Sequence, residues 1–198
     1  MDAPRHDPAP ETAPILRPMT SGLAVLAGLL RLVPHPWNCT PVGALGLFAG
    51  GRLRSWHAFA VPVGVMVCSD ILLALFWQKQ PFDPFVYASF LVNVLLGRWL
   101  CRTESAARIG LASLLASFQF YLVTNFGAWL QLSSEAFGTY TRDLNGLAMA
   151  YVAGLPFSGG TFVGDLFFTA TLFGLHAWLV RHAFPRERVV PLVGQVDS

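Results

Sequence analysis

The stretch "WHAFAVPVGVMVCSDILLALFW", residues 56–77, decides the fold class. It is almost wholly apolar, and Asp70 is its one carboxylate. A helix needs about 20 such residues to cross the hydrocarbon core of a bilayer. The whole chain agrees, because charged residues make up 12% and hydrophobic residues 54% of it, whereas charged residues are about 25% of ordinary soluble domains. We therefore expect an integral membrane protein.

Five further hydrophobic segments flank this stretch, at residues 19–33, 40–51, 84–100, 109–130 and 161–181. Together they predict an all-α bundle of six transmembrane helices over residues 19–184. Residues 40–51 are short and glycine-rich, so they either cross tilted or form a re-entrant segment. Residues 1–18 are rich in proline and predict a disordered cytoplasmic tail, and residues 185–198 predict a cytoplasmic C-terminal tail.

Apolar residues recur at helical spacing over residues 143–157, which predicts a short interfacial helix before the last span or else a seventh span. The basic residues discriminate between these alternatives. With six spans and a cytoplasmic N-terminus, ten arginines face the cytoplasm, namely Arg5, Arg17, Arg52, Arg54, Arg98, Arg102, Arg108, Arg181, Arg186 and Arg188, and Arg31, Lys79 and Arg142 face outside. Seven spans would move the last three arginines across the membrane and leave seven basic residues in the cytoplasm against six outside. The positive-inside rule therefore favours six spans with both termini cytoplasmic.

On this topology the connector "PHPWNCTP", residues 34–41, lies on the outer side. Its three prolines remove backbone donors and stiffen the chain. Irregular backbone at membrane depth is tolerated only against protein or a water-filled cavity. The segment is therefore expected to form the rim of a pocket, with His35 and Asn38 as contacts. The alternative is a rigid turn in which Thr40 and Pro41 begin the second helix.

Polar side chains inside predicted spans mark a candidate binding pocket, because they are costly in hydrocarbon. Residues of the last span, including Asp165, Thr169 and His176, share one inward stripe. The predicted contacts to a small molecule are His35, Asn38, Asp70, Asn93, Tyr121, Asn125, Trp129 and Asp165. Alternatively, Trp129 is an interfacial anchor, and Asp70 or Asp165 pairs with Arg31 or Arg142.

Small residues in the first span, Ala24 and Gly28, are spaced to let a helix of a partner subunit approach closely, or else to pack within the chain. The sequence contains no phosphate loop and no HExxH or GxSxG motif, and its three cysteines show no CxxC spacing. We therefore expect no enzyme activity, no cofactor and no metal site. A net charge of +2 does not suggest nucleic acid as a partner.

Three motifs carry a resemblance: "PHPWNCTPVGALGLFAGG" at 34–51, "VTNFGAWL" at 123–130 and "YVAGLPFSGGTFVGDLFFTATLFG" at 151–174. With them the chain resembles an uncharacterised family of six-helix proteins of the bacterial cytoplasmic membrane. That family is in turn similar to the S components of energy-coupling factor (ECF) transporters. The resemblance implies uptake of a small solute or vitamin-like compound, with a membrane coupling subunit and cytoplasmic ATPases as partners. The alternative function is a structural accessory subunit of a larger membrane complex.

Overall fold

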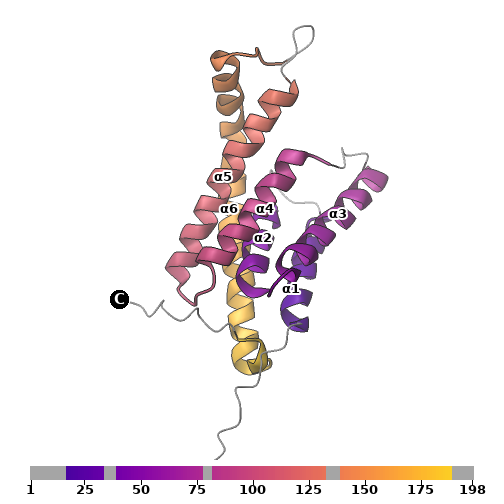
Figure 1. Cartoon of the computed structure of the whole chain (residues 1–198), viewed down its shortest axis with the longest axis vertical. Coiled ribbons are helices and arrows are strands. Elements are labelled where there is room, and N and C mark those ends of the chain that lie inside the picture. Colours follow the sequence, from indigo (N-terminus) through magenta and orange to yellow (C-terminus); the bar gives the residue numbers. More distant parts are fainter. Residues whose placement is uncertain (1–16, 34–38, 78–81, 133–138, 189–198) are drawn as a thin grey trace, which may run out of the picture.

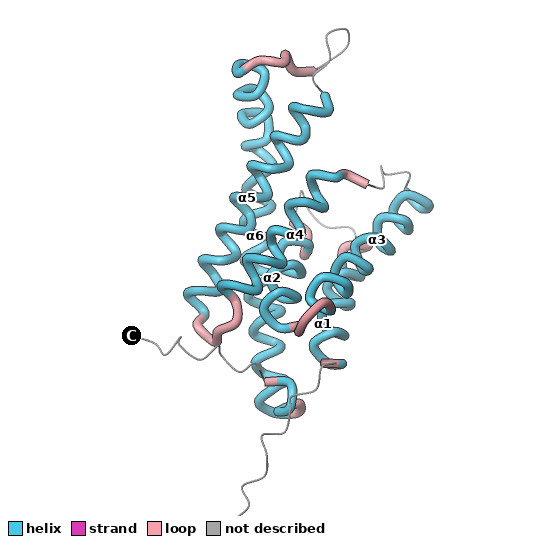
Figure 2. Tube along the Cα trace, viewed as in Figure 1, coloured by secondary structure: helices cyan, strands magenta, loops and turns pink. Residues whose placement is uncertain are grey.

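The computed structural model describes residues 17–33, 39–77, 82–132 and 139–188. These residues form six α-helices and a final 3₁₀ turn: α1 Pro18–Leu30, α2 Val42–Arg52, α3 His57–Trp77, α4 Pro84–Leu100, α5 Ala106–Leu132, α6 Leu144–His182 and η1 Pro185–Glu187 (Figures 1 and 2). The predicted all-α class is confirmed. His35 and Asn38 lie outside the described residues.

Three of the helices are long and apolar enough to cross a membrane: α3 over His57–Phe76, α5 and α6. Helices α1 and α4 are apolar but shorter, with 13 and 17 residues. Large apolar side chains cover much of the surface, and Leu75, Trp99 and Val163 are each about two-thirds exposed or more. A soluble monomer rarely exposes so much contiguous apolar surface. These features indicate a membrane protein. Of the six predicted spans, three are long and apolar enough to cross a membrane by themselves.

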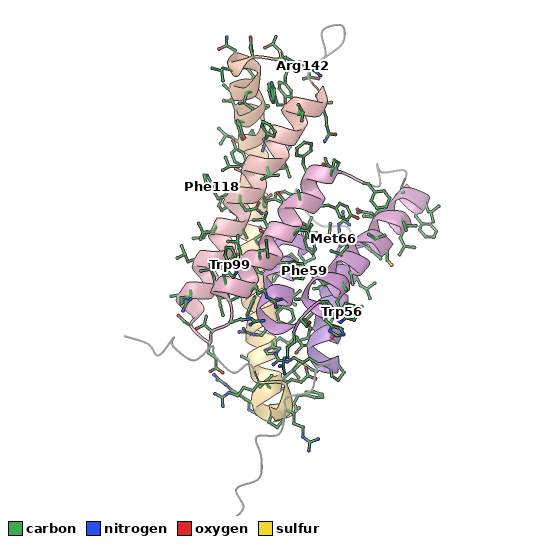
Figure 3. The ribbon with its side chains drawn as sticks, viewed as in Figure 1. Trp56, Phe59, Met66, Trp99, Phe118 and Arg142 are labelled. Atoms are coloured by element: carbon green, nitrogen blue, oxygen red, sulfur yellow. The ribbon has the colours of Figure 1, made fainter. Side chains whose placement is uncertain are left out.

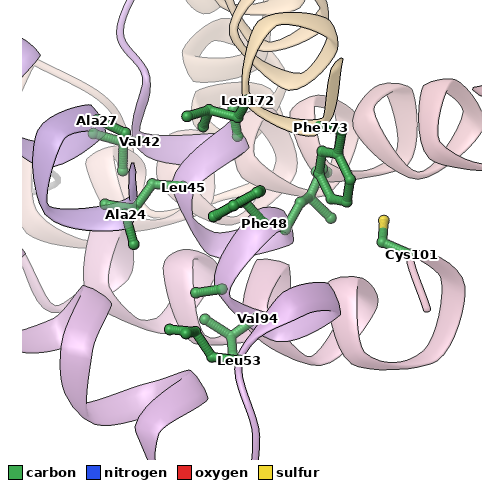
Figure 4. Close-up of a cluster of buried hydrophobic side chains, with 14 of the residues drawn as sticks. Ala24, Ala27, Val42, Leu45, Phe48, Leu53, Val94, Cys101, Leu172 and Phe173 are labelled. Atoms are coloured by element: carbon green, nitrogen blue, oxygen red, sulfur yellow. The ribbon is translucent and has the colours of Figure 1, made fainter. Parts of the chain in front are cut away.

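Helix α2 is the centre of the bundle. Every one of its 11 residues is buried, and its length of about 16 Å is roughly half the hydrocarbon thickness. Its side chains, among them Leu45 and Phe48, form the core with residues of the surrounding helices (Figure 4). Helix α4 approaches especially closely, since a Cβ added to Gly97 would lie 2.2 Å from the carbonyl oxygen of Leu47. Glycine is required there because two backbones touch.

Helix α6 corrects the prediction for residues 143–157. The expected interfacial helix is instead the first part of one continuous helix of 39 residues, with Pro156 inside it. Helix α5 packs along this part of α6, and the hydroxyl groups of Tyr121 and Tyr151 each donate to a carbonyl of the opposite helix. These contacts hold the helix across the proline.

One end of the bundle, hereafter the arginine end, gathers alternate helix termini. Arg17 before α1 donates to the carbonyl of Arg52 at the end of α2, and Arg52 donates to the carbonyl of Cys101 after α4. Glu187 of η1 caps α1, accepting from Thr20 N at 2.9 Å. The following arginines lie at or beside these termini: Arg17, Arg52, Arg54, Arg98, Arg102, Arg108, Arg181, Arg186 and Arg188. Arg142 lies at the opposite end, which agrees with the predicted grouping (Figure 3).

Candidate functional site

The carboxylate of Asp165, on α6, lies against the start of α2. It is 3% exposed, accepts from Ser117 Oγ at 2.7 Å and accepts from the backbone N–H of Ala44. Helix α2 begins without a cap from its own side chains, so Asp165 supplies the acceptor that its first turn needs. Gly43 allows this approach, because a Cβ there would lie 2.2 Å from Asp165 Oδ1.

A cavity of about 230 Å³ opens beside this carboxylate. We call it the outer cavity, because Arg31 at the end of α1 and Thr40 before α2 place it away from the arginine end. Its lining consists of Arg31, Thr40, Val42, Gly43, Val86, Phe120, Thr161 and Asp165. A guanidinium and a carboxylate therefore share one small cavity. Arg31 belongs to this lining although the sequence suggested it only as a neighbour or pairing partner.

Asp70 is engaged by the chain itself. It forms an ion pair with Arg31, and Asp70 Oδ2 accepts from the hydroxyl of Tyr87 at 2.7 Å. Arg31 also donates to Ser69 Oγ at 2.8 Å. The alternative prediction, pairing of Asp70 with Arg31, therefore describes the structure. Asp70 does not line the outer cavity but holds in place the arginine that does.

A second cavity, of about 260 Å³, lies between α5 and α6. We call it the tyrosine cavity; its lining is Ser117, Phe120, Tyr121, Thr124, Asn125, Ala128, Gly154, Phe157, Ser158, Thr161 and Phe162. It brings Tyr121 and Asn125 together as predicted. Both make internal hydrogen bonds, since Tyr121 donates to the carbonyl of Tyr151 at 2.6 Å and Asn125 to that of Tyr121 at 2.8 Å. Phe120 and Thr161 also line the outer cavity, so the two cavities adjoin there.

Two predicted contacts lie in neither cavity. Asn93 is fully buried and accepts from Gln119 Nε2 at 2.7 Å, and the same nitrogen contacts the carbonyl of Ser89 at 3.0 Å. Gln119 was not among the predicted contacts, so this amide network was missed. Trp129 Nε1 donates to the carbonyl of Thr141 at 2.9 Å. That bond ties the end of α5 to the segment before α6, and the role of Trp129 as an interfacial anchor stays a prediction.

Ala24 and Gly28 are buried within the chain. A Cβ added to Gly28 would lie 1.8 Å from Val65 Cγ1 of α3 and 3.8 Å from Leu45 of α2. The internal-packing alternative thus describes both positions. The predicted use of these residues for a partner helix is corrected, because α3 and α2 already occupy that face of α1.

Among the described residues, no group of three or more histidine, cysteine, aspartate and glutamate side chains could hold a metal ion.

Outside the helices, Asp143 forms the cap of α6. Hydrogen bonds from the backbone of Gly146 and from the Thr141 hydroxyl hold the pKa of Asp143 below its usual value. This carboxylate is therefore a local structural element and lies apart from both cavities.

Residues 15–188 match a protein family described as a family of unknown function, DUF6580. The chain belongs to the DUF6580 family. The match includes all six helices and every described residue of both cavities. No curated protein matches the chain, and no solved structure matches it. The expected uncharacterised family is therefore confirmed, and the similarity of that family to ECF S components stays a prediction.

Proposed function

We propose that this DUF6580 protein is a membrane subunit that binds a small polar solute, as the S components of ECF transporters do. The observation that carries the proposal is the outer cavity, in which Arg31 and Asp165 line one space beside the start of α2. Opposite charges with the apolar walls of Phe120 and Val86 are suited to a small solute that bears both polar and apolar groups. The adjoining tyrosine cavity provides aromatic area for stacking.

The proposed topology has six crossings, with the arginine end and both termini in the cytoplasm of a bacterium. The grouping of arginines at one end supports this orientation. Helix α2 is short, but the other helices surround it and all of its residues are buried. A segment that does not reach across the bilayer is tolerated at membrane depth where protein, and not lipid, encloses it. The outer cavity then faces the extracytoplasmic side, from which a solute would be captured.

In this proposal the chain binds and releases its solute and catalyses no reaction. A membrane coupling subunit and cytoplasmic ATPases would supply the energy, as the motif resemblance implies. The contact to a coupling subunit must involve exposed positions other than Ala24 and Gly28. Helix α1 offers such a face, since Leu26 and Leu29 are each about half exposed.

The test is to purify the protein from its native host in mild detergent and to identify small molecules by mass spectrometry. We expect a molecule in stoichiometric amount that is lost in Asp165→Asn, because this change removes the charge at nearly constant size. The matched control is Thr171→Val, an exposed position on the same helix whose hydroxyl bonds only to its own helix. Retention of the molecule by Asp165→Asn, or its absence from the wild type, would overturn the proposal.

A second candidate is a structural accessory subunit of a larger membrane complex. It is favoured by the internal hydrogen bonds that Asp70, Asn93, Tyr121 and Trp129 make. On this view the polar groups only join helices, and the exposed apolar faces carry contacts to other subunits. The same purification discriminates, because a stable set of membrane subunits unrelated to ATP-driven transport, with no small molecule, would select it.

A further inference from the structure

Two adjoining cavities of about 360 and 270 Å³ lie at the arginine end. Both are lined by Arg52, Glu104, Ala177 and Arg181. We call them together the arginine slot. The slot lies between α5 and α6 and begins at the arginine end, and its lining shares no residue with the outer cavity or the tyrosine cavity. It is therefore distinct from the proposed solute site. The slot was not predicted from the sequence, because these arginines were interpreted only as topology signals.

The floor of the slot is a buried cation. Arg52 is 4% exposed, and its guanidinium carbon lies 4.6 Å from the centre of the Phe173 ring. Its two terminal nitrogens donate to the carbonyls of Cys101 and Thr103. Its Nε is buried without any hydrogen-bond partner, and among the described residues no carboxylate lies within 4.0 Å of it. The charge of Glu104 attracts this cation from beyond contact distance. Among the described residues no anion touches the guanidinium, so an anionic ligand would be favoured beside it.

The mouth of the slot adds further positive charge. Arg181 and Arg188 both line it, and they share a single carboxylate, Glu104, at 4.0 and 3.4 Å. All three of these side chains are more than half exposed, so each can turn toward a ligand. Nearby, burial and the charge of Arg54 lower the pKa of Arg17, as expected where cations crowd together. An anionic group is therefore the complement of this mouth.

The walls of the slot are apolar. Ile109 and Gly110 of α5 face Leu166, Ala170 and Phe173 of α6, and a Cβ added at Gly110 would meet nothing within 4 Å. From Arg181 to Leu166 the slot follows α6 for about 22 Å at 1.5 Å per residue. That exceeds half of the roughly 30 Å hydrocarbon core. A free phosphate would use the mouth alone and leave this length of wall unexplained.

We propose that the arginine slot binds an anionic phospholipid, with its phosphate between Arg52, Arg181 and Arg188 and an acyl chain along the wall formed by α5 and α6. Basic pockets between helices on the cytoplasmic side of a membrane are suited to such headgroups. The lipid would stabilise the arginine end, where the termini of all six helices meet. A second copy of the chain or a protein partner would not need the combination of buried cation and long narrow wall.

The test is native mass spectrometry of the purified full chain, titrated with palmitoyl-oleoyl phosphatidylglycerol or with the phosphatidylcholine of the same acyl chains. We expect the phosphatidylglycerol to be retained preferentially. Arg181→Gln should weaken its binding about fivefold, the effect of one arginine near a lipid surface. Gly110→Leu should weaken the binding of either lipid, because the new side chain would occupy the space beside the wall that the acyl chain needs. It should not disturb the protein, since a Cβ at this position meets no protein atom within 4 Å. Arg52→Gln is a poorer probe, since Arg52 also holds two loop carbonyls.

Two matched control variants make the same kinds of substitution outside the slot, and so test whether the effect depends on the position of the changed residue. Arg102→Gln removes a charge from the same end without touching the slot lining, and Gly159→Leu adds the same bulk at another open position, on α6. Both should bind phosphatidylglycerol as the wild type does. Equal retention of the two lipids, wild-type binding by Gly110→Leu, or complete displacement of the lipid by millimolar inorganic phosphate would each overturn the proposal; the last result would indicate a free-anion site.

Discussion

Asp165 carries two separable properties, a charge and a pair of hydrogen bonds, and two substitutions distinguish them. Asp165→Ala removes the acceptor for Ser117 and for the Ala44 backbone N–H, both buried. A hydrogen bond to a charged group contributes about 1.5 to 3 kcal/mol, so the free energy of unfolding should fall by about 3 kcal/mol or more. Asp165→Asn keeps an acceptor for Ala44, and its amide can donate to Ser117, so the loss should stay near the 1 kcal/mol of a helix-dipole interaction.

The measurement is thermal unfolding in mild detergent, followed by far-UV circular dichroism. For a chain of this size, 1 kcal/mol corresponds to a shift of about 2 to 4 °C, so Asp165→Ala should lower the midpoint by about 6 °C or more. The control is Thr171→Ala on the exposed side of α6, expected to change the free energy by less than about 0.5 kcal/mol. Equal destabilisation by Asp165→Asn and Asp165→Ala would refute the reasoning, because it would make the charge the stabilising element.

Further measurements test three other features. Gly97→Ala should lower the free energy of unfolding by about 2 kcal/mol, because the added carbon meets backbone of α2 that cannot move aside; unchanged stability would contradict the close helix contact. Arg31→Gln and Asp70→Asn should each cost about 3 kcal/mol and together less than their sum; strictly additive effects in this double-mutant cycle would argue against the pair. The hydrogen bond from Gly146 lowers the pKa of Asp143, so the cap of α6 is present above the usual carboxyl pKa of 3.8 and is lost as the pH falls below that value. Hydrogen exchange in the first turn of α6 should therefore rise at this low pH. The variant Asp143→Ala, which has no cap at any pH, should show no such rise.

Much of the helical arrangement follows from local signals. The bounds predicted for α3 and α4 agree with the structure, because α4 begins with Pro84 after the capping Asp83 and ends before the arginine-containing turn at Cys101. The continuous α6 could not be predicted from its own residues. Its Pro156 and the glycines after it are typical of a helix end, and only the packing of α5 along α6, which is a tertiary effect, maintains the helix there.

Features of the site that depend on the residue spacing within one helix could be predicted. Features that depend on how two helices are rotated against each other could not. The inward stripe of α6 is confirmed, since Asp165, Thr169 and His176 are each 3% exposed or less. In contrast, Arg31 was only one of two partners offered for Asp70, and neither Tyr87 nor Gln119 was identified as a partner of Asp70 or Asn93. These contacts depend on the relative rotation of neighbouring helices, which hydrophobic periodicity leaves undetermined. Ser117 was missed for a related reason, because a neutral hydroxyl on a helix gives no signal until its partner across the bundle is known.

The length of α6 determines how deep the proposed solute site lies. At 1.5 Å per residue its 39 residues extend about 58 Å, roughly twice the hydrocarbon core. Arginines avoid hydrocarbon, so the portion inside the core ends near Arg181 and begins about 20 residues earlier, near Thr161. In the proposed topology Asp165 then lies about 24 Å from Arg181 along the helix, in the outer half of the membrane.

Residues 144–160 continue α6 away from the arginine end beside α5, and they contribute Gly154, Phe157 and Ser158 to the tyrosine cavity. The tyrosine cavity thus lies on the outer side of the outer cavity, and the two adjoin at Phe120 and Thr161. In the proposed function a solute would pass from the aromatic walls of the tyrosine cavity to Arg31 and Asp165 in the outer cavity. In the proposed topology both charges line a cavity in the outer half of the membrane, away from the centre of the bilayer, where an ion is most costly.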